Sequence, residues 1–159
     1  MAEQERKQST GKTAQWVTFS LGDETYGIDV MRVQEVLPLS EIAPVPGAPS
    51  YVLGIINLRG NVVTVIDTRM RFGMESRDPD DAARIVVIET ADQVAGILVD
   101  SVAEVINVAA EEVDTAPNVG NVESARYIQG VVSRGEDLLI LVDVNRLLTR
   151  EEWQEVATL

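Results

Sequence analysis

Residues 27–36, GIDVMRVQEV, return later in the chain as residues 96–105, GILVDSVAEV, and this repetition decides the fold. Glycine, isoleucine, valine, glutamate and valine match in register at an offset of 69 residues. A second match, YVLGI at 51–55 with YIQGV at 127–131, follows at an offset of 76. The offset changes in the intervening loops, where insertions are tolerated. The sequence therefore predicts that the chain contains two copies of the same structural unit.

The apolar runs are short, rich in valine and isoleucine, and separated by turn residues, which is typical of β-strands. In WVTFSL, alternation predicts one face with Val17, Phe19 and Leu21 and another with Trp16, Thr18 and Ser20. Five strands are expected in each half, near 16–21, 25–30, 33–38, 54–58 and 61–67, and near 84–89, 93–99, 102–108, 130–134 and 138–143. This predicts a mainly β protein of two five-stranded barrels, because barrel closure removes exposed edges.

The predicted boundaries follow composition. Residues 1–15 are polar and are expected to form a disordered tail before one domain at 16–150. Its halves, 16–72 and 84–148, are joined by an acidic surface connection at 73–83, GMESRDPDDAA. Whether each barrel is contiguous or exchanges strands with the other stays open.

Helices are expected to be few. TREEWQEVATL, residues 149–159, has the spacing of a capping box and predicts a C-terminal helix that buries Trp153, Val156 and Leu159. Single helical turns are expected from Ser50 and from Ser124.

Composition excludes several classes of function. The formal charge of −13 argues against nucleic acid or an anionic membrane as the main partner. The chain has no cysteine and no histidine, which removes thiolate chemistry and the commonest general base and metal ligand. No apolar run reaches the length of about 18 residues that spans a bilayer, so a cytoplasmic protein without direct membrane insertion is expected.

Three carboxylates are the candidates for chemistry. Asp67, Asp100 and Asp143 follow apolar runs, and two acids placed together could serve in acid/base catalysis or bind a divalent cation. Asp67 and Asp143 hold equivalent positions in the repeat, so capping of the next turn explains both. Phosphate loops, dinucleotide fingerprints, nucleophile elbows and metal clusters are missing, and we expect no enzyme, cofactor or metal.

Surface residues remain as functional candidates. Glu35 stands beside Val33 and Val36 on a strand whose alternation would point Glu35 and Val33 the same way. Arg59 precedes Gly60 at an expected hairpin tip, and arginine is over-represented at binding hot spots. In the second half, SRGED is expected to place Arg134 and Gly135 at the matching tip.

At these residues the sequence resembles the CheW family, the coupling adaptors of bacterial chemotaxis. The resemblance runs from about Trp16 to Trp153 and is carried by FSLGDETYGIDVMRVQEVLPL, PGAPSYVLGIINLRGNVVTVIDTRMRFG, IVVIETADQVAGILVDSVAEVI, YIQGVV and LLILVDVNRLL. It implies two SH3-like barrels and a non-catalytic scaffold. The implied partners are the cytoplasmic tip of methyl-accepting chemoreceptors and the regulatory domain of a CheA-type histidine kinase, in receptor arrays at the membrane.

The resemblance also implies contact residues. Glu35 and Arg59 match positions at partner contacts, with Val33, Val36 and Gly54 beside them, and Val105 matches a position associated with receptor binding in a groove between the barrels. Tyr127 and Ile128 are weaker candidates for a contact of the second barrel.

Two alternatives stay open. The first is an adaptor of the same fold in a related surface-sensing or motility pathway. The second, from a different class, is a small carboxylate-dependent hydrolase that would draw together Asp67, Asp100 or Asp143.

Overall fold

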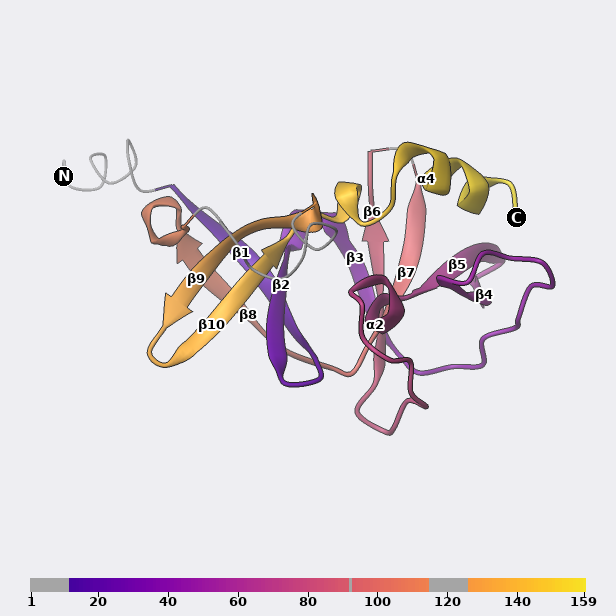
Figure 1. Cartoon of the computed structure of the whole chain (residues 1–159), viewed down its shortest axis with the longest axis horizontal. Coiled ribbons are helices and arrows are strands. Elements are labelled where there is room, and N and C mark those ends of the chain that lie inside the picture. Colours follow the sequence, from indigo (N-terminus) through magenta and orange to yellow (C-terminus); the bar gives the residue numbers. More distant parts are fainter. Residues whose placement is uncertain (1–11, 92, 115–125) are drawn as a thin grey trace.

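The computed structural model describes residues 12–91, 93–114 and 126–159. In this part of the chain ten strands form two five-stranded sheets (Figure 1). The strands are β1 (Thr13–Leu21), β2 (Glu24–Asp29), β3 (Val33–Pro38), β4 (Val52–Leu58), β5 (Asn61–Asp67), β6 (Arg84–Glu89), β7 (Val94–Val99), β8 (Ser101–Ala109), β9 (Ile128–Arg134) and β10 (Asp137–Val142). The helical elements that lie wholly within the described residues are η1 (Val30–Arg32), α2 (Thr68–Arg71), η2 (Ala110–Glu112), η3 (Val144–Arg146) and α4 (Arg150–Ala157). The prediction of a mainly β protein with few helices is confirmed.

The two halves of the chain exchange strands. One sheet has the order β8-β1-β2-β10-β9, and the other has the order β3-β6-β7-β5-β4. We call them barrel 1 and barrel 2. Each barrel combines strands from both halves of the chain, so neither is contiguous. In Figure 1 barrel 1 lies on the left and barrel 2 on the right.

An isolated bridge closes each barrel at an equivalent place. In barrel 2 the backbone of Ala43 pairs with Ile55, with N–H···O distances of 2.9 and 2.8 Å. In barrel 1 Asp114 pairs with Val131 at 2.8 and 2.9 Å. The repeat in the sequence therefore corresponds to a repeat of backbone pairing, including the closing contact.

The largest buried cluster joins the two barrels. It contains Phe19 and Ile140 of barrel 1 together with Val86 and Ile97 of barrel 2. Each barrel also has a smaller core of its own, with Trp16, Leu139 and Leu141 in barrel 1 and Val63, Val65 and Ile85 in barrel 2. Because the shared cluster is the largest, burial of apolar surface fixes the barrels against each other.

The predicted alternation of side chains in β1 is confirmed, and both faces of the strand are buried. Trp16 faces the core of barrel 1, while Phe19 and Leu21 face the shared cluster. Trp16 and Thr18, on the face opposite Phe19, are also buried, at 5% and 4% exposed. Both faces are buried because one packs inside barrel 1 and the other packs toward barrel 2.

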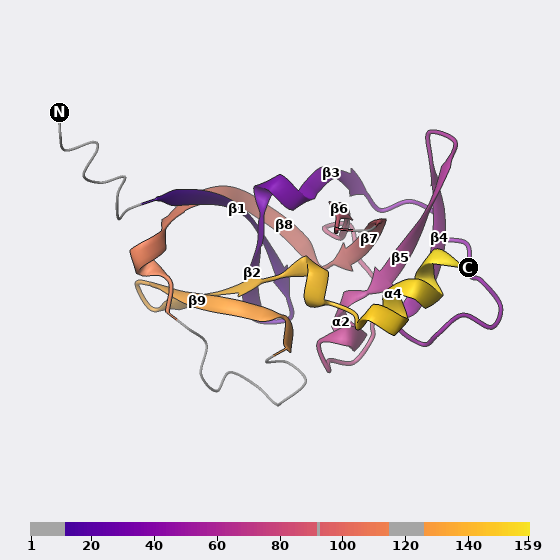
Figure 2. The same ribbon diagram turned by 90° about the horizontal axis from the view of Figure 1, so that it is seen from above.

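Helix α4 follows barrel 1 in the chain but lies beside barrel 2 (Figures 1 and 2). Thr149 and Glu152 form the predicted capping box, and Trp153 and Val156 join the shared cluster. Arg71 of α2 donates two hydrogen bonds to the Glu152 carboxylate at 2.9 and 3.1 Å, which ties the two helices together.

Three local expectations need correction. Thr13, Ala14 and Gln15 are not a tail but the start of β1, where they pair with β8. Leu159 is 46% exposed, because α4 ends at Ala157 and Leu159 lies beyond the helix. The segment at Ser50 forms a turn closed by Val52 N–H to Pro49 oxygen and not a helix. Ser124 lies outside the described residues.

Candidate partner-binding site

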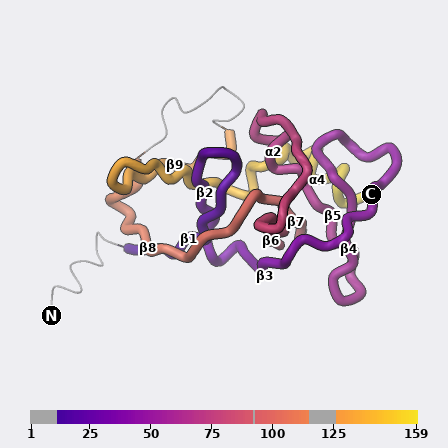
Figure 3. Tube along the Cα trace, turned by 90° about the horizontal axis from the view of Figure 1, so that it is seen from below, coloured from indigo at the N-terminus to yellow at the C-terminus, as the bar shows by residue number. Residues whose placement is uncertain are grey.

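The β4–β5 hairpin carries Arg59 at its tip. Figure 2 shows this hairpin projecting beyond barrel 2 on the side of β3, and Figure 3 shows the same projection from below. Its two turn residues, Arg59 and Gly60, have φ angles of 52° and 88°. Positive φ at both positions is the signature of the type I′ turn, whose twist matches that of paired strands. The Asn57 side chain accepts a hydrogen bond from the Gly60 N–H at 2.8 Å and holds the turn.

Arg59 stands in a conformation that disfavours arginine. Among the described residues it is the one non-glycine residue with a positive φ. In the equivalent barrel 1 hairpin, Arg134 is the last residue of β9 and pairs with Asp137, so Gly135, with φ 63°, holds the matching position. The expectation that Arg134 matches Arg59 is therefore wrong by one residue. Strained backbone is retained where something else requires it, which favours a functional role for Arg59.

The Arg59 side chain reaches back to β3 and pairs with Glu35. Its Nη1 donates to Glu35 Oε1 at 3.4 Å, and its Nη2 donates to Oε2. The hydrogen bond, with the positive charge of Arg59 adding to it, lowers the pKa of Glu35. The Arg59 side chain is 70% exposed, so donors beyond those two bonds face solvent.

A β-bulge at Gln34 separates Glu35 from its valine neighbours. Val33 pairs with Ile88 and Val36 with Val86, whereas Glu35 pairs with Val87 on the other face of β6. Residues paired across strands share a face, so Glu35 points away from Val33 and Val36. The expectation that Glu35 and Val33 point the same way is wrong, because simple alternation fails at a bulge.

Val33, Val36 and Val105 lie along the boundary between the two barrels, which we call the seam. Val33 packs on the shared cluster, and Val36, 38% exposed, stands across from Val86 of that cluster. Val105 of barrel 1 is 52% exposed and pairs with Val17, which in turn pairs with Ile28 of the cluster. These valines therefore present apolar surface from both barrels at the exposed margin of the shared cluster.

Gly54 has a backbone role. It is buried, and a Cβ there would lie 2.2 Å from the Ala43 carbonyl oxygen, at the bridge that closes barrel 2. Gly130 holds the same place in barrel 1, beside the Asp114–Val131 bridge. Gly54 thus shapes the barrel beneath the hairpin and offers no side chain to a partner.

The weaker candidates differ in exposure. Tyr127 is 3% exposed and stacks on Phe72, with ring centroids 4.2 Å apart, so it belongs to the shared cluster. This placement does not support a direct contact through its ring. Ile128 is half-buried against the same cluster and keeps some exposed surface.

Two exposed apolar side chains were not predicted. Val62, 67% exposed, lies on the same hairpin as Arg59, and Met31, 81% exposed, lies in η1 just before β3. The structure shows the same exposure at the repeat counterpart of Val62, Leu138, which is 41% exposed, but in the sequence both positions are simply apolar. Nothing in the sequence distinguishes Met31 from a buried residue.

The three aspartates do not meet at one site, because Asp67 and Asp100 line a cavity of barrel 2 while Asp143 lines a hollow of barrel 1. Asp67 and Asp143 cap α2 and η3 by accepting N–H bonds from Met70 and Asn145, which confirms the predicted capping. Asp100 accepts bonds from the Gly22 N–H at 2.7 Å and from Arg69 at 2.6 Å. Within the described residues no group of three or more acids could hold a metal ion. This arrangement does not support the hydrolase.

Comparison with known proteins gives a consistent result. A family model described as CheW-like domain matches residues 15–152. The chemotaxis protein CheW of Treponema pallidum is 39% identical over 91% of this chain and 88% of its own length. That of Klebsiella aerogenes is 35% identical over 87% and 83%. The crystal structure of the scaffolding protein TtCheW from Thermoanaerobacter tengcongensis superimposes with a TM-score of 0.79 at 33% identity, covering 86% of this chain and 92% of that one.

A search of the described residues for a helix long and apolar enough to cross a membrane finds none.

Proposed function

Since the chain belongs to the CheW-like family, we propose that it is a non-catalytic adaptor of chemotaxis signalling. It couples the cytoplasmic tips of methyl-accepting chemoreceptors to the regulatory domain of a CheA-type histidine kinase, in the cytoplasm beneath a receptor array. The observation that carries the proposal is that β3 serves two surfaces, with Glu35 on one face and Val33 and Val36 on the other.

The seam surface, formed by Val33, Val36 and Val105, suits a receptor helix. Its side chains are apolar and belong to both barrels, and they lie at the edge of a packed core that provides a rigid wall. An amphipathic helix docks by laying its apolar face on such a surface. The position of Val105 within the family supports the same assignment.

The hairpin surface, formed by Glu35, Arg59 and Val62, suits the kinase regulatory domain. It combines an exposed apolar side chain with a guanidinium group whose orientation Glu35 fixes. A pre-oriented arginine loses less side-chain entropy when it meets a partner carboxylate or carbonyl. Partners on separate surfaces can be held at once, which raises their effective concentration toward each other.

Two matched variants test the proposal. Val105→Glu places a charge on the seam surface, and Arg59→Glu reverses the charge of the hairpin surface. Val105→Glu is expected to weaken receptor binding by at least about tenfold with kinase binding kept, and Arg59→Glu to do the reverse. Binding is measured by calorimetry with the purified kinase regulatory domain and with a receptor tip fragment. If both variants fold and bind both partners as the wild type does, the proposal is wrong.

Pathway assignment has a separate test. The receptor recovered with this chain in a pull-down distinguishes swimming chemotaxis from a surface-sensing or motility pathway served by the same fold.

A further inference from the structure

A cavity of about 470 Å³ lies at the end of barrel 2. Leu53 at the start of β4, Asp67 at the end of β5 and Leu98 near the end of β7 line it. The Glu35–Arg59 pair instead stands where β3 begins and the β4–β5 hairpin turns, so the cavity opens at the opposite end of the barrel. Its volume is in the range of small-molecule sites, which often occupy barrel mouths.

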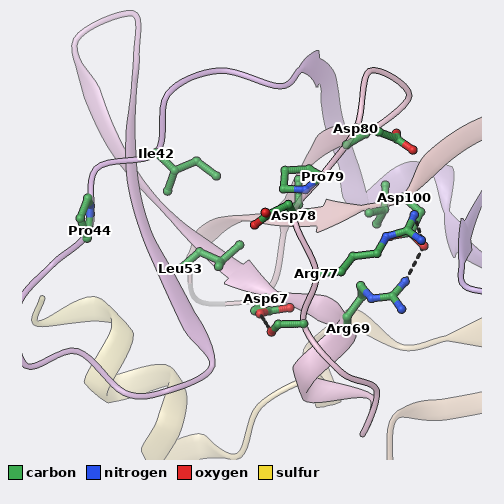
Figure 4. A pocket seen from close by; sticks show the side chains of 14 residues that line it. Ile42, Pro44, Leu53, Asp67, Arg69, Arg77, Asp78, Pro79, Asp80 and Asp100 are labelled. Carbon is green, nitrogen blue, oxygen red and sulfur yellow. Dashed lines mark hydrogen bonds and ion pairs between the residues drawn. The ribbon is translucent and has the colours of Figure 1, made fainter.

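The cavity has an apolar wall and a charged wall. In Figure 4, Ile42 and Leu53 stand on one side, and Arg69 and Arg77 reach toward Asp100 on the other. Ile42, Leu53 and Leu98 are half-buried and pack against the core of barrel 2. Their remaining exposed surface faces the cavity, where a ligand with an apolar body would cover it.

The repeat shows that the fold does not require this apolar wall. Barrel 1 has a hollow at the equivalent end, which Asp143 lines in the place of Asp67. There the counterparts of Leu53 and Leu98 are Gln129 and Asp29, at the offsets of 76 and 69 residues that relate the two copies. The same backbone thus carries a polar hollow in one barrel and an aliphatic one in the other.

The charges of the cavity favour a cation. Four carboxylates line it against two guanidinium groups, and both guanidinium groups pair with Asp100. Asp67 is 6% exposed and accepts bonds from the Met70 N–H and the Ser76 hydroxyl, which leaves acceptor capacity on its oxygens. Among the described ion pairs none involves Asp78, whose carboxylate lies between the apolar and charged walls in Figure 4.

We propose that this cavity, lined by Ile42, Leu53, Leu98, Asp67 and Asp78, binds an alkylammonium or alkylguanidinium group. The aliphatic part lies on the leucines and the cationic head lies toward Asp78. Such a group can come from a free small amine or from a lysine or arginine side chain of a partner protein. The site is independent of the adaptor surfaces and of the function proposed for them.

The test is a nitrogen–proton NMR titration of the full chain with hexylamine. Saturable shifts are expected at the amides of Ile42, Leu53 and Leu98. Hexanoate, with the same alkyl chain and a negative head, and ammonium chloride, with no chain, are expected to leave these amides unmoved. If hexanoate binds as well as hexylamine, or if hexylamine gives no saturable shift, the proposal is overturned.

Two variants test the apolar contact and the charged contact of the site separately. Leu53→Gln introduces the residue of barrel 1 and is expected to abolish hexylamine binding. Asp78→Asn is expected to weaken it about threefold, the effect of one exposed ion pair. Glu136→Gln, at the exposed hairpin tip of barrel 1, is the matched control and should leave affinity unchanged. If Asp78→Asn and Leu53→Gln both fold and bind hexylamine as the wild type does, the site is wrong.

A capped dipeptide, acetyl-leucyl-lysine amide, tests whether the alkylammonium group belongs to a free amine or to a side chain of a partner protein. If the dipeptide binds more tightly than hexylamine, and the amide shifts extend to Asp80 and Ala83, the group comes from a partner side chain. Tighter binding of hexylamine supports a free amine. If neither compound shifts the cavity amides, no alkylammonium source fits and the proposal is overturned.

Discussion

Barrels 1 and 2 repeat the same backbone with different surfaces. Both keep a tyrosine whose carbonyl accepts the N–H of the capping aspartate, Tyr51 for Asp67 at 2.8 Å and Tyr127 for Asp143 at 2.9 Å. They differ at other matched positions, as at Arg59, where barrel 1 has Gly135 in the same left-handed conformation. Residues that both copies keep at a backbone contact, such as these tyrosines and aspartates, serve the fold, whereas Arg59 stands where barrel 1 has Gly135 and is a candidate for function.

The closing glycines give the largest expected effect. Gly54→Ala should lower the free energy of unfolding by about 3–4 kcal/mol, because the new Cβ would lie 2.2 Å from a carbonyl oxygen in a barrel bridge. Gly130→Ala should cost about 1–2 kcal/mol, because the nearest atom, 2.6 Å away, is a methyl of the Val113 side chain and the nearest backbone atom, the Asp114 carbonyl oxygen, lies farther off at 3.0 Å. Chemical denaturation measures both. Equal losses would show that the two closures are equally rigid and would contradict this reading.

Exchange of the turn residues gives a smaller effect. Gly135→Arg should destabilise the fold by about 1 kcal/mol, since it places a side chain at φ 63°, and should leave both partners bound. Arg59→Gly relieves the same backbone conformation while it removes the pair with Glu35, so we expect little change in stability and a loss of kinase binding. Thermal unfolding and calorimetry measure the two effects. A large stability loss in Arg59→Gly would show that the arginine serves the fold.

The smallest expected effect is on pH dependence. Arg59 lowers the pKa of Glu35 in the folded state, so the pair stabilises the fold above the ordinary glutamate pKa, and this contribution is lost as the pH falls through the lowered value. A carboxyl NMR titration of Arg59→Gln should show the pKa of Glu35 rising toward 4.5. The free energy of unfolding of Arg59→Gln should approach that of the wild type at acid pH. An unchanged Glu35 pKa would contradict the pairing in solution.

Sequence reasoning could predict what periodicity and repetition encode. The strands, the capping aspartates and the helix that begins after Thr149 all follow from local pattern. The exchange of strands between the barrels could not be predicted, because it depends on the shared cluster, whose members lie far apart in the chain.

The site was only partly predictable. The sequence indicates Glu35 and Arg59 as candidates, and the structure pairs them with each other. The bulge at Gln34 and the one-residue difference between the hairpins depend on strand register, which the residue types do not reveal. From the sequence alone, apolar residues such as Val36 and Val105 could be buried or exposed. Their exposure depends on where the neighbouring barrel lies.

The most direct test of the adaptor role is a charge swap within the hairpin surface. Glu35→Arg combined with Arg59→Glu keeps an ion pair inside the protein but reverses the charges offered to a partner. Affinity for the kinase regulatory domain is measured for the wild type, for Arg59→Glu and for the double variant, with thermal unfolding as the check on folding. We predict that the double variant folds and that its kinase binding remains at least about tenfold weaker than that of the wild type. Recovery of wild-type affinity in the double variant would show that the pair only supports the fold, and would contradict the account.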